Sequence, residues 1–132
     1  MKKITILFIL LVSTVIFSSP SYAGWTRVSS SGGGANTFYV DFDRIRKVDG
    51  YVYYWELGDL FKPMGNTDIL SVKTYNQVDC KKFRINRLTF SSYKEPLGKG
   101  SDETFNPETE WLYPPPDSSL ETFLKFACEF VK

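Results

Sequence analysis

The sequence of 132 residues contains no histidine. Without an imidazole ring, the chain cannot build a Ser-His-Asp or a Cys-His catalytic site, and most kinds of zinc site lose a ligand. No pair of acidic residues lies in a recognisable catalytic motif. Residues 98–101 (Gly-Lys-Gly-Ser) lack both the full spacing and the flanking strand and helix of a phosphate-binding loop. We therefore predict that the protein is not an enzyme and that it binds no cofactor.

A metal-binding motif is also lacking. Asp41, Asp43 and Asp49 lie near one another in the sequence and are the residues that best suggest a cation site. An EF-hand needs a glycine at its sixth position and a glutamate at its twelfth, and these aspartates fit neither register. We interpret them as solvated carboxylates of turns and predict no metal site.

The chain has no excess of charge of one sign. It carries 16 Lys and Arg against 15 Asp and Glu, a formal net charge of +1. Removal of an N-terminal signal containing Lys2 and Lys3 would leave 14 of the 16 basic residues against 15 acidic ones, a net charge near −1. Because nucleic-acid binding depends on a surplus of basic residues, we expect no nucleic-acid partner.

Only one long hydrophobic run is present, at residues 4–17, after the basic pair Lys2 and Lys3. Its 14 residues would span about 21 Å as a helix, short of the roughly 30 Å hydrocarbon core of a bilayer. Ser21 and Ala23 place small residues where a signal peptidase reads them. We predict that residues 1–23 are a signal peptide and that residues 24–132 form a single domain with no membrane-spanning segment.

The predicted cleavage site has no cysteine beside it that could carry a lipid. We therefore expect an exported chain that is not lipid-anchored and that resides in the periplasm or at the cell surface, or is secreted. Cys80 and Cys128 are the two cysteines, and an even number in an exported chain predicts a disulfide bond. Such a bond, closing a loop of 48 residues, would stabilise the fold by about 4 kcal/mol. A reactive thiol beside Lys81 and Lys82 is the disfavoured alternative.

Alternation of apolar and polar residues predicts an antiparallel β-sheet of about five to six strands. The predicted strands are residues 25–29, 37–41, 51–57, 69–78 and 83–93, with a short segment at 44–47. Asp49-Gly50 is typical of a tight hairpin turn. The strand at 51–57 is apolar on both faces, which favours a central position. In the last strand, the apolar positions change parity between Ile85 and Leu88, which indicates a β-bulge.

Residues 94–110 predict a loop, because they contain prolines, glycines and acidic residues with few apolar ones. Residues 111–113 are expected to pair briefly before three prolines stop the ladder. Ser118 and Glu121 then form the pattern of a capping box at the start of a C-terminal helix. The apolar stripe of this helix contains Leu120, Phe123, Leu124, Ala127, Cys128 and Val131. The fold class predicted is α+β, with the helix packed on one sheet face by the disulfide.

Two groups of residues are candidates for partner binding. Tyr51, Tyr53 and Tyr54, together with Trp55, form the aromatic run of the central strand. Aromatic side chains with a polar tip are common at interface hot spots, although these residues are equally suited to a core. Lys82 and Arg84 belong to a basic cluster with Lys81 and Arg87. This cluster fits an acidic partner, but a solvated strand edge that charge protects from aggregation is the favoured reading.

An ordered set of motifs then resembles the surface-adhesin protein E family of exported Gram-negative proteins. The motifs are Trp25-Thr26-Arg27-Val28, Phe38-Tyr39-Val40-Asp41, Ile45, Gly50, Tyr54-Trp55-Glu56-Leu57, Ser71-Val72-Lys73, Asp79-Cys80, Arg84, Gly100, Trp111, Ser118 or Ser119, and Ala127-Cys128. The resemblance spans nearly all of the predicted mature chain and implies an antiparallel sheet backed by a helix.

The resemblance also implies a function in cell adhesion. The family name denotes a surface-exposed adhesin that binds host extracellular-matrix proteins, and its best-known member is a lipoprotein that can dimerise. We therefore expect a non-enzymatic protein-binding module, with a homodimer among its expected states. A periplasmic accessory or inhibitor-like protein that acts on another envelope protein is the alternative, since a fold does not fix a function.

Overall fold

The computed structural model describes residues 24–31, 33 and 35–132. The predicted signal peptide, residues 1–23, lies outside the described residues. The described chain forms a seven-stranded antiparallel sheet in the order β1-β2-β4-β5-β6-β7, with β3 paired to β4. The strands are β1 (Trp25–Ser31), β2 (Asn36–Asp41), β3 (Arg46–Val48), β4 (Tyr51–Leu60), β5 (Ser71–Asp79), β6 (Arg84–Tyr93) and β7 (Asp102–Phe105). The predicted α+β fold class is confirmed.

Strand β4 is central, as predicted, because it pairs with β2 and β3 on one side and with β5 on the other. The β3–β4 hairpin turns at Asp49 and Gly50, whose φ angles are 51° and 83°. Positive φ at both turn residues matches the twist of the flanking strands, and Asp-Gly is suited to it. The hairpin that this dipeptide predicted is therefore confirmed.

The predicted bulge lies in β6. Tyr75 of β5 pairs with Thr89, whereas the next residue, Asn76, pairs with Arg87, so Leu88 is the extra residue. The bulge shifts the side-chain alternation by one position. As a result, Arg87 and Phe90 line the same side of the sheet although they are three residues apart.

The prediction that residues 94–110 form one long loop is wrong. This segment contains a 3₁₀ turn, η2 (Pro96–Gly98), and the edge strand β7. All four residues of β7 are exposed, so no apolar alternation could reveal the strand from sequence. Its pairing with β6 is reinforced by Phe105, whose ring stacks on Phe90 with centroids 5.3 Å apart. The brief pairing expected of residues 111–113 is confirmed by a bridge between Ile85 and Leu112.

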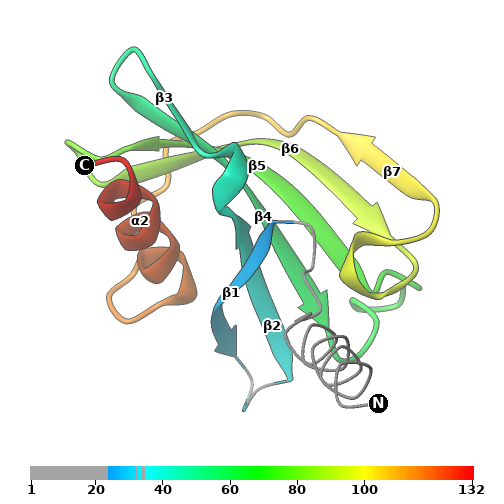
Figure 1. The fold of residues 1–132 in the computed structure, drawn as a ribbon. Coiled ribbons are helices and arrows are strands. Elements are labelled where there is room, and N and C mark those ends of the chain that lie inside the picture. Colours follow the sequence, from blue (N-terminus) through cyan, green and yellow to red (C-terminus); the bar gives the residue numbers. More distant parts are fainter. Residues whose placement is uncertain (1–23, 32, 34) are drawn as a thin grey trace, which may run out of the picture.

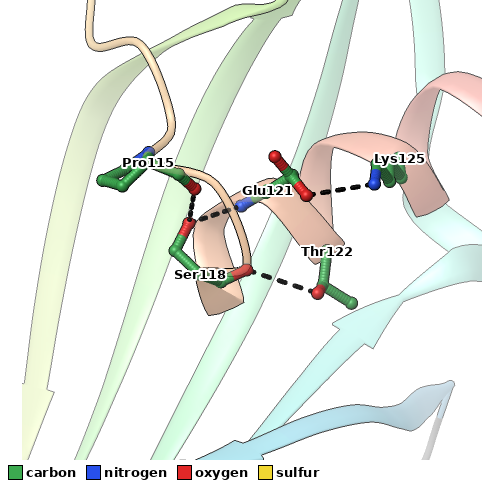
Figure 2. A network of polar contacts seen from close by, with 5 residues as sticks. All are labelled: Pro115, Ser118, Glu121, Thr122 and Lys125. Atoms are coloured by element: carbon green, nitrogen blue, oxygen red, sulfur yellow. Dashed lines mark hydrogen bonds and ion pairs between the residues drawn. The ribbon is translucent and has the colours of Figure 1, made fainter.

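The C-terminal helix α2 (Ser119–Phe130) begins at the predicted cap. Figure 2 shows that the hydroxyl of Ser118 accepts a hydrogen bond from the Glu121 backbone N–H at 3.1 Å and donates to the Pro115 carbonyl at 2.7 Å. The Glu121 carboxylate accepts from Lys125 at 3.0 Å, one turn further along the helix. The cap therefore satisfies one of the free N–H groups of the first turn.

Helix α2 packs on one face of the sheet (Figure 1). Its buried residues Phe123, Leu124 and Ala127 meet a cluster on the sheet that contains Val40, Val52, Tyr54, Val78 and Ile85. The disulfide between Cys80 and Cys128 joins the end of β5 to this helix, as predicted. The hydrophobic core thus lies between α2 and one end of the sheet.

One aspartate is not solvated as predicted. Asp41 is only 1% exposed, because it caps the 3₁₀ turn η1 (Phe42–Arg44) at the end of β2. Its carboxylate accepts from the Asp43 backbone N–H at 3.2 Å and from the Arg44 guanidinium at 2.6 Å. Asp41 therefore has a structural role in ending β2, whereas Asp43 and Asp49 are exposed as expected.

Candidate interaction surface

The sheet face opposite α2 carries a row of aromatic side chains. Strand alternation places Tyr51, Tyr53 and Trp55 of β4 on this face, and the register sets Tyr75 of β5 directly beside Trp55. Trp111 stacks on Tyr51 from the segment that follows β7, with ring centroids 5.9 Å apart. All five side chains are partly exposed. We call them, together with Arg46 and Arg84, the aromatic face.

The aromatic face is densest around Tyr75. Its ring lies 4.8 Å from that of Trp55 and 6.1 Å from that of Tyr53, measured between centroids. Arg46 donates a hydrogen bond to the Tyr75 hydroxyl at 2.7 Å, and its guanidinium lies 5.7 Å from the centre of the Tyr53 ring. Gln77 donates to the Tyr53 hydroxyl at 3.0 Å. These contacts fix the orientation of each ring while leaving part of it open to a partner.

The other end of the aromatic face is organised by Arg84. Its guanidinium lies 4.2 Å from the centre of the Trp111 ring and pairs with Asp79 at 3.1 Å. Burial alone would raise the pKa of the Asp79 carboxyl, but hydrogen bonds from the Lys82 backbone and from Arg84 outweigh it and lower the pKa. Asp79 therefore stays ionised and holds Arg84 over the tryptophan.

The structure separates the predicted partner-binding residues. Tyr51, Tyr53 and Arg84 lie on the aromatic face, and Lys82 is exposed on the adjoining β5–β6 turn. Tyr54 does not belong to this surface, because its side chain points to the opposite face and is 0% exposed. That residue is therefore corrected to a core position. For the other four residues, a binding role stays a prediction.

The basic cluster is also divided. Lys81 and Lys82 are exposed in the turn between β5 and β6. Arg84 and Arg87 lie on opposite faces of β6 and are partly buried. The reading of all four as a solvated strand edge is wrong, because Lys81 and Lys82 belong to the turn before β6, and Arg84 and Arg87 are partly buried.

Sequence reasoning missed Tyr75, Trp111 and Arg46. The alternation of the predicted strand 69–78 carried a signal for Tyr75, since Tyr75 has the opposite parity to the core residues of its strand. The Asp49-Gly50 turn carried a signal for Arg46, since a two-residue hairpin aligns Arg46 with Tyr53. Trp111 reaches this face only through tertiary pairing, beside the bridge between Leu112 and Ile85, and no local pattern predicts that contact.

Tyr, Trp and Arg, the residue types of the aromatic face, are those that contribute most to protein–protein binding. Because their orientations are already fixed, less side-chain freedom is lost on association. A shallow depression beside this cluster is lined by Asp43, Arg44, Ile45, Arg46, Trp55 and Tyr75. Within the described part of the chain, no three His, Cys, Asp or Glu side chains gather as they would around a metal ion. The arrangement therefore suits contact with a protein surface.

The fold of the described residues defines a class: a small α+β domain in which a disulfide-linked C-terminal helix packs on one face of an antiparallel sheet. The sequence profile of the family "Surface-adhesin protein E" matches residues 25–129. The chain belongs to this family, and the resemblance predicted from its motifs is confirmed.

Solved structures of Haemophilus influenzae protein E share the fold. Its crystal form II has 19% sequence identity and a TM-score of 0.66, over 85% of this chain and 93% of that one. The selenomethionine form has 17% identity and a TM-score of 0.63, over 83% and 88%. Protein E from a non-typeable strain has 17% identity and a TM-score of 0.57, over 84% and 79%. No curated protein sequence is significantly similar to the chain.

The family and the fold support a surface-adhesin-like function. Among residues 24–31, 33 and 35–132, no helix is both long enough and apolar enough to cross a bilayer.

Proposed function

We propose that this chain is an exported, non-enzymatic protein-binding module that contacts its partner through the aromatic face. Membership of the surface-adhesin protein E family supports protein binding in general. The observation that carries the choice of surface is the cluster of Trp55, Tyr75 and Arg46, which remains accessible although Arg46 is already hydrogen-bonded to the Tyr75 hydroxyl. A host extracellular-matrix protein is the first candidate partner.

The predicted signal peptide at residues 1–23 and the single domain at residues 24–132 are part of this proposal. With no cysteine beside the predicted cleavage site, attachment through an N-terminal lipid is not expected. The alternative partner is another envelope protein of the same cell, which would make the chain a periplasmic accessory or inhibitor-like protein.

The proposal is tested by surface plasmon resonance on protein recovered after expression of the full chain. Immobilised matrix proteins and an extract of the producing cell's envelope provide the two sets of partners. Saturable binding to a matrix protein supports the adhesin, and retention of an envelope protein alone supports the periplasmic alternative. Binding to neither contradicts both.

Variants then locate the surface. Tyr75→Ala and Arg46→Ala are each expected to weaken binding at least tenfold, because hot-spot residues of these types contribute roughly 2 kcal/mol or more. Phe126→Ala is the matched control, since Phe126 is an exposed aromatic residue on α2. Equal losses in all three variants, or a loss only in Phe126→Ala, would contradict the assignment to the aromatic face.

Homodimer formation remains a separate proposal. It is tested by sedimentation equilibrium of the wild type and Tyr75→Ala. A dimer that dissociates in the variant would show that the aromatic face binds a second copy of the chain.

A further inference from the structure

A second surface lies on the same sheet face as α2, in the part of that face that the helix does not cover. Figure 1 shows that α2 and β7 lie at opposite sides of the sheet. Between them is a groove of about 440 Å³. One wall is formed by Leu120 and Phe123 of α2, and Met64 and Phe105 stand at the rim with 47% and 57% of their surfaces exposed. A cavity of this size is typical of sites for small molecules.

The sheet itself provides an apolar floor with a polar group at its inner end. Phe38, Val72 and Phe90 are apolar lining residues, whereas Glu56 and Arg87 contribute a carboxylate and a guanidinium. The strand register explains their proximity. Glu56 lies opposite Thr74 on β5, and the next residues on that face, Tyr54, Asn76 and Arg87, form the adjacent cross-strand row.

This polar end contains groups that the protein leaves without partners. Glu56 is 6% exposed and lines the groove, and its Oε2 atom is buried with no hydrogen bond within the described part of the chain. The Nε of Arg87, which also lines the groove, is likewise buried without a hydrogen bond, and so is the side-chain amide of Asn76, which lies in the row behind it. An unpaired buried polar group costs free energy, so such groups commonly mark a functional position. The bulge at Leu88 brings Arg87 to this site.

The two charges at the polar end restrict the kind of molecule that fits. Glu56 and Arg87 have opposite charges and lie diagonally across β5, so that together they come close to neutrality. A bound carboxylate would add a negative charge beside Glu56, and a bound ammonium would add a positive charge beside Arg87. An uncharged head that both donates and accepts hydrogen bonds meets both groups without that repulsion.

We propose that this groove binds an uncharged amphipathic small molecule, with its single apolar tail between α2 and β7 and a hydroxyl- or amide-bearing head at Glu56 and Arg87. The tail contacts Val72, Phe90 and Leu120. The head donates to the Glu56 carboxylate and accepts from the Arg87 guanidinium. This inference concerns the helix-bearing face and is independent of protein binding by the aromatic face.

The test is isothermal titration calorimetry with three probes that share a ten-carbon tail, each below its micellar concentration: 1-decanoyl glycerol, decanoate and decyltrimethylammonium. Protein recovered after expression of the full chain is used. We expect saturable binding of one decanoyl glycerol per chain, about tenfold or more tighter than that of either charged probe. Absence of binding by all three, or tighter binding of a charged probe, overturns the proposal.

Two variants place the site. Ile69→Trp fills the groove at its rim and is expected to weaken decanoyl glycerol binding at least tenfold. Val48→Trp is the matched control, because Val48 is exposed on β3 and does not line the groove. Binding that survives Ile69→Trp overturns the assignment, as does a dimer in sedimentation that Ile69→Trp dissociates, since a second copy would then occupy the groove.

Charge variants test the head-group contacts. Glu56→Gln leaves Arg87 without its opposite charge and should shift the preference toward decanoate, whereas Arg87→Gln should shift it toward decyltrimethylammonium. An unchanged order of affinities in both folded variants overturns the role of these two residues. Should either variant fail to fold by circular dichroism, methyl NMR shifts of Val72 and Leu120 in the wild type decide instead, because a probe in the groove must perturb both.

Discussion

Tyrosines on the two faces of the sheet differ both in exposure and in hydrogen bonding. On the aromatic face, the hydroxyls of Tyr53 and Tyr75 are paired with Gln77 and Arg46, although the rings are partly exposed. On the helix-bearing face, Tyr54 is fully buried, yet its hydroxyl has no hydrogen-bond partner in the described part of the chain. Of these three tyrosine hydroxyls, the two near water are hydrogen-bonded and the buried one is not.

The exposure of a polar group and its hydrogen bonding must therefore be considered together. A partly exposed surface is suited to a protein partner when hydrogen bonds and ring contacts hold its side chains in place before contact. A buried, unpaired group instead has a cost that a ligand can remove. Adjacent residues of one strand thus differ, since Tyr53 belongs to the aromatic face and Tyr54 to the core.

The largest expected effect on stability comes from removing the covalent link between α2 and the sheet. Cys128→Ser removes the disulfide that links α2 to β5 and should lower the free energy of unfolding by about 2 to 5 kcal/mol. Urea denaturation of the variant and of the oxidised wild type measures this difference. Wild type with its disulfide reduced is the control and should resemble the variant. Equal midpoints for the oxidised wild type and the variant would contradict a stabilising role of the bond.

A matched pair of substitutions compares the two faces directly. Tyr53→Phe loses the hydrogen bond from Gln77 and should destabilise the fold by about 0.5 to 1.5 kcal/mol. Tyr54→Phe removes a buried hydroxyl without a partner and should leave stability unchanged or raise it by about 1 kcal/mol. Urea denaturation at one pH gives both values. The comparison fails if Tyr54→Phe is the more destabilising of the two.

The smallest expected effect is a difference in pH dependence. Burial raises the pKa of the Glu56 carboxyl above its usual range, while the nearby Arg87 guanidinium and the Asn76 side chain oppose that shift. The folded state then binds the Glu56 proton more tightly than the unfolded state. Stability from this group is present at low pH and declines as pH rises through the folded pKa.

Glu56→Gln should remove this loss of stability with rising pH. Melting temperatures between pH 4.5 and pH 8 should fall more steeply with rising pH in the wild type than in the variant. Asp79 acts in the opposite direction and in another window, since its lowered pKa gives stability that is lost only as pH falls below the ordinary aspartate range. Parallel curves for wild type and Glu56→Gln would show that Glu56 is not perturbed.

Much of the fold could be predicted from the sequence, because alternation, turn residues and a helix cap act locally. The Asp49-Gly50 turn, the Ser118 cap and the bulge near Leu88 each leave a signal within a few residues. Strand β7 left none, because all four of its residues are exposed and its position depends on the β6 edge.

The sites could be predicted only in part. The aromatic run of the central strand predicts Tyr51 and Tyr53 as binding residues. The same run includes Tyr54, whose side chain the strand alternation turns to the other face. Trp111 meets Tyr51 from 60 positions away through tertiary pairing. The polar end of the groove depends on the pairing of three strands, which sequence does not specify.

The most direct test of the account is hydroxyl-radical footprinting of the chain, free and bound to the partner found by surface plasmon resonance. This method reads the exposure of single aromatic side chains. We predict that binding protects Tyr53, Trp55 and Tyr75 from oxidation and leaves Phe126 and Phe130, exposed on α2, unchanged. Protection of the two phenylalanines with none on the aromatic face would contradict the assignment of protein binding to that face.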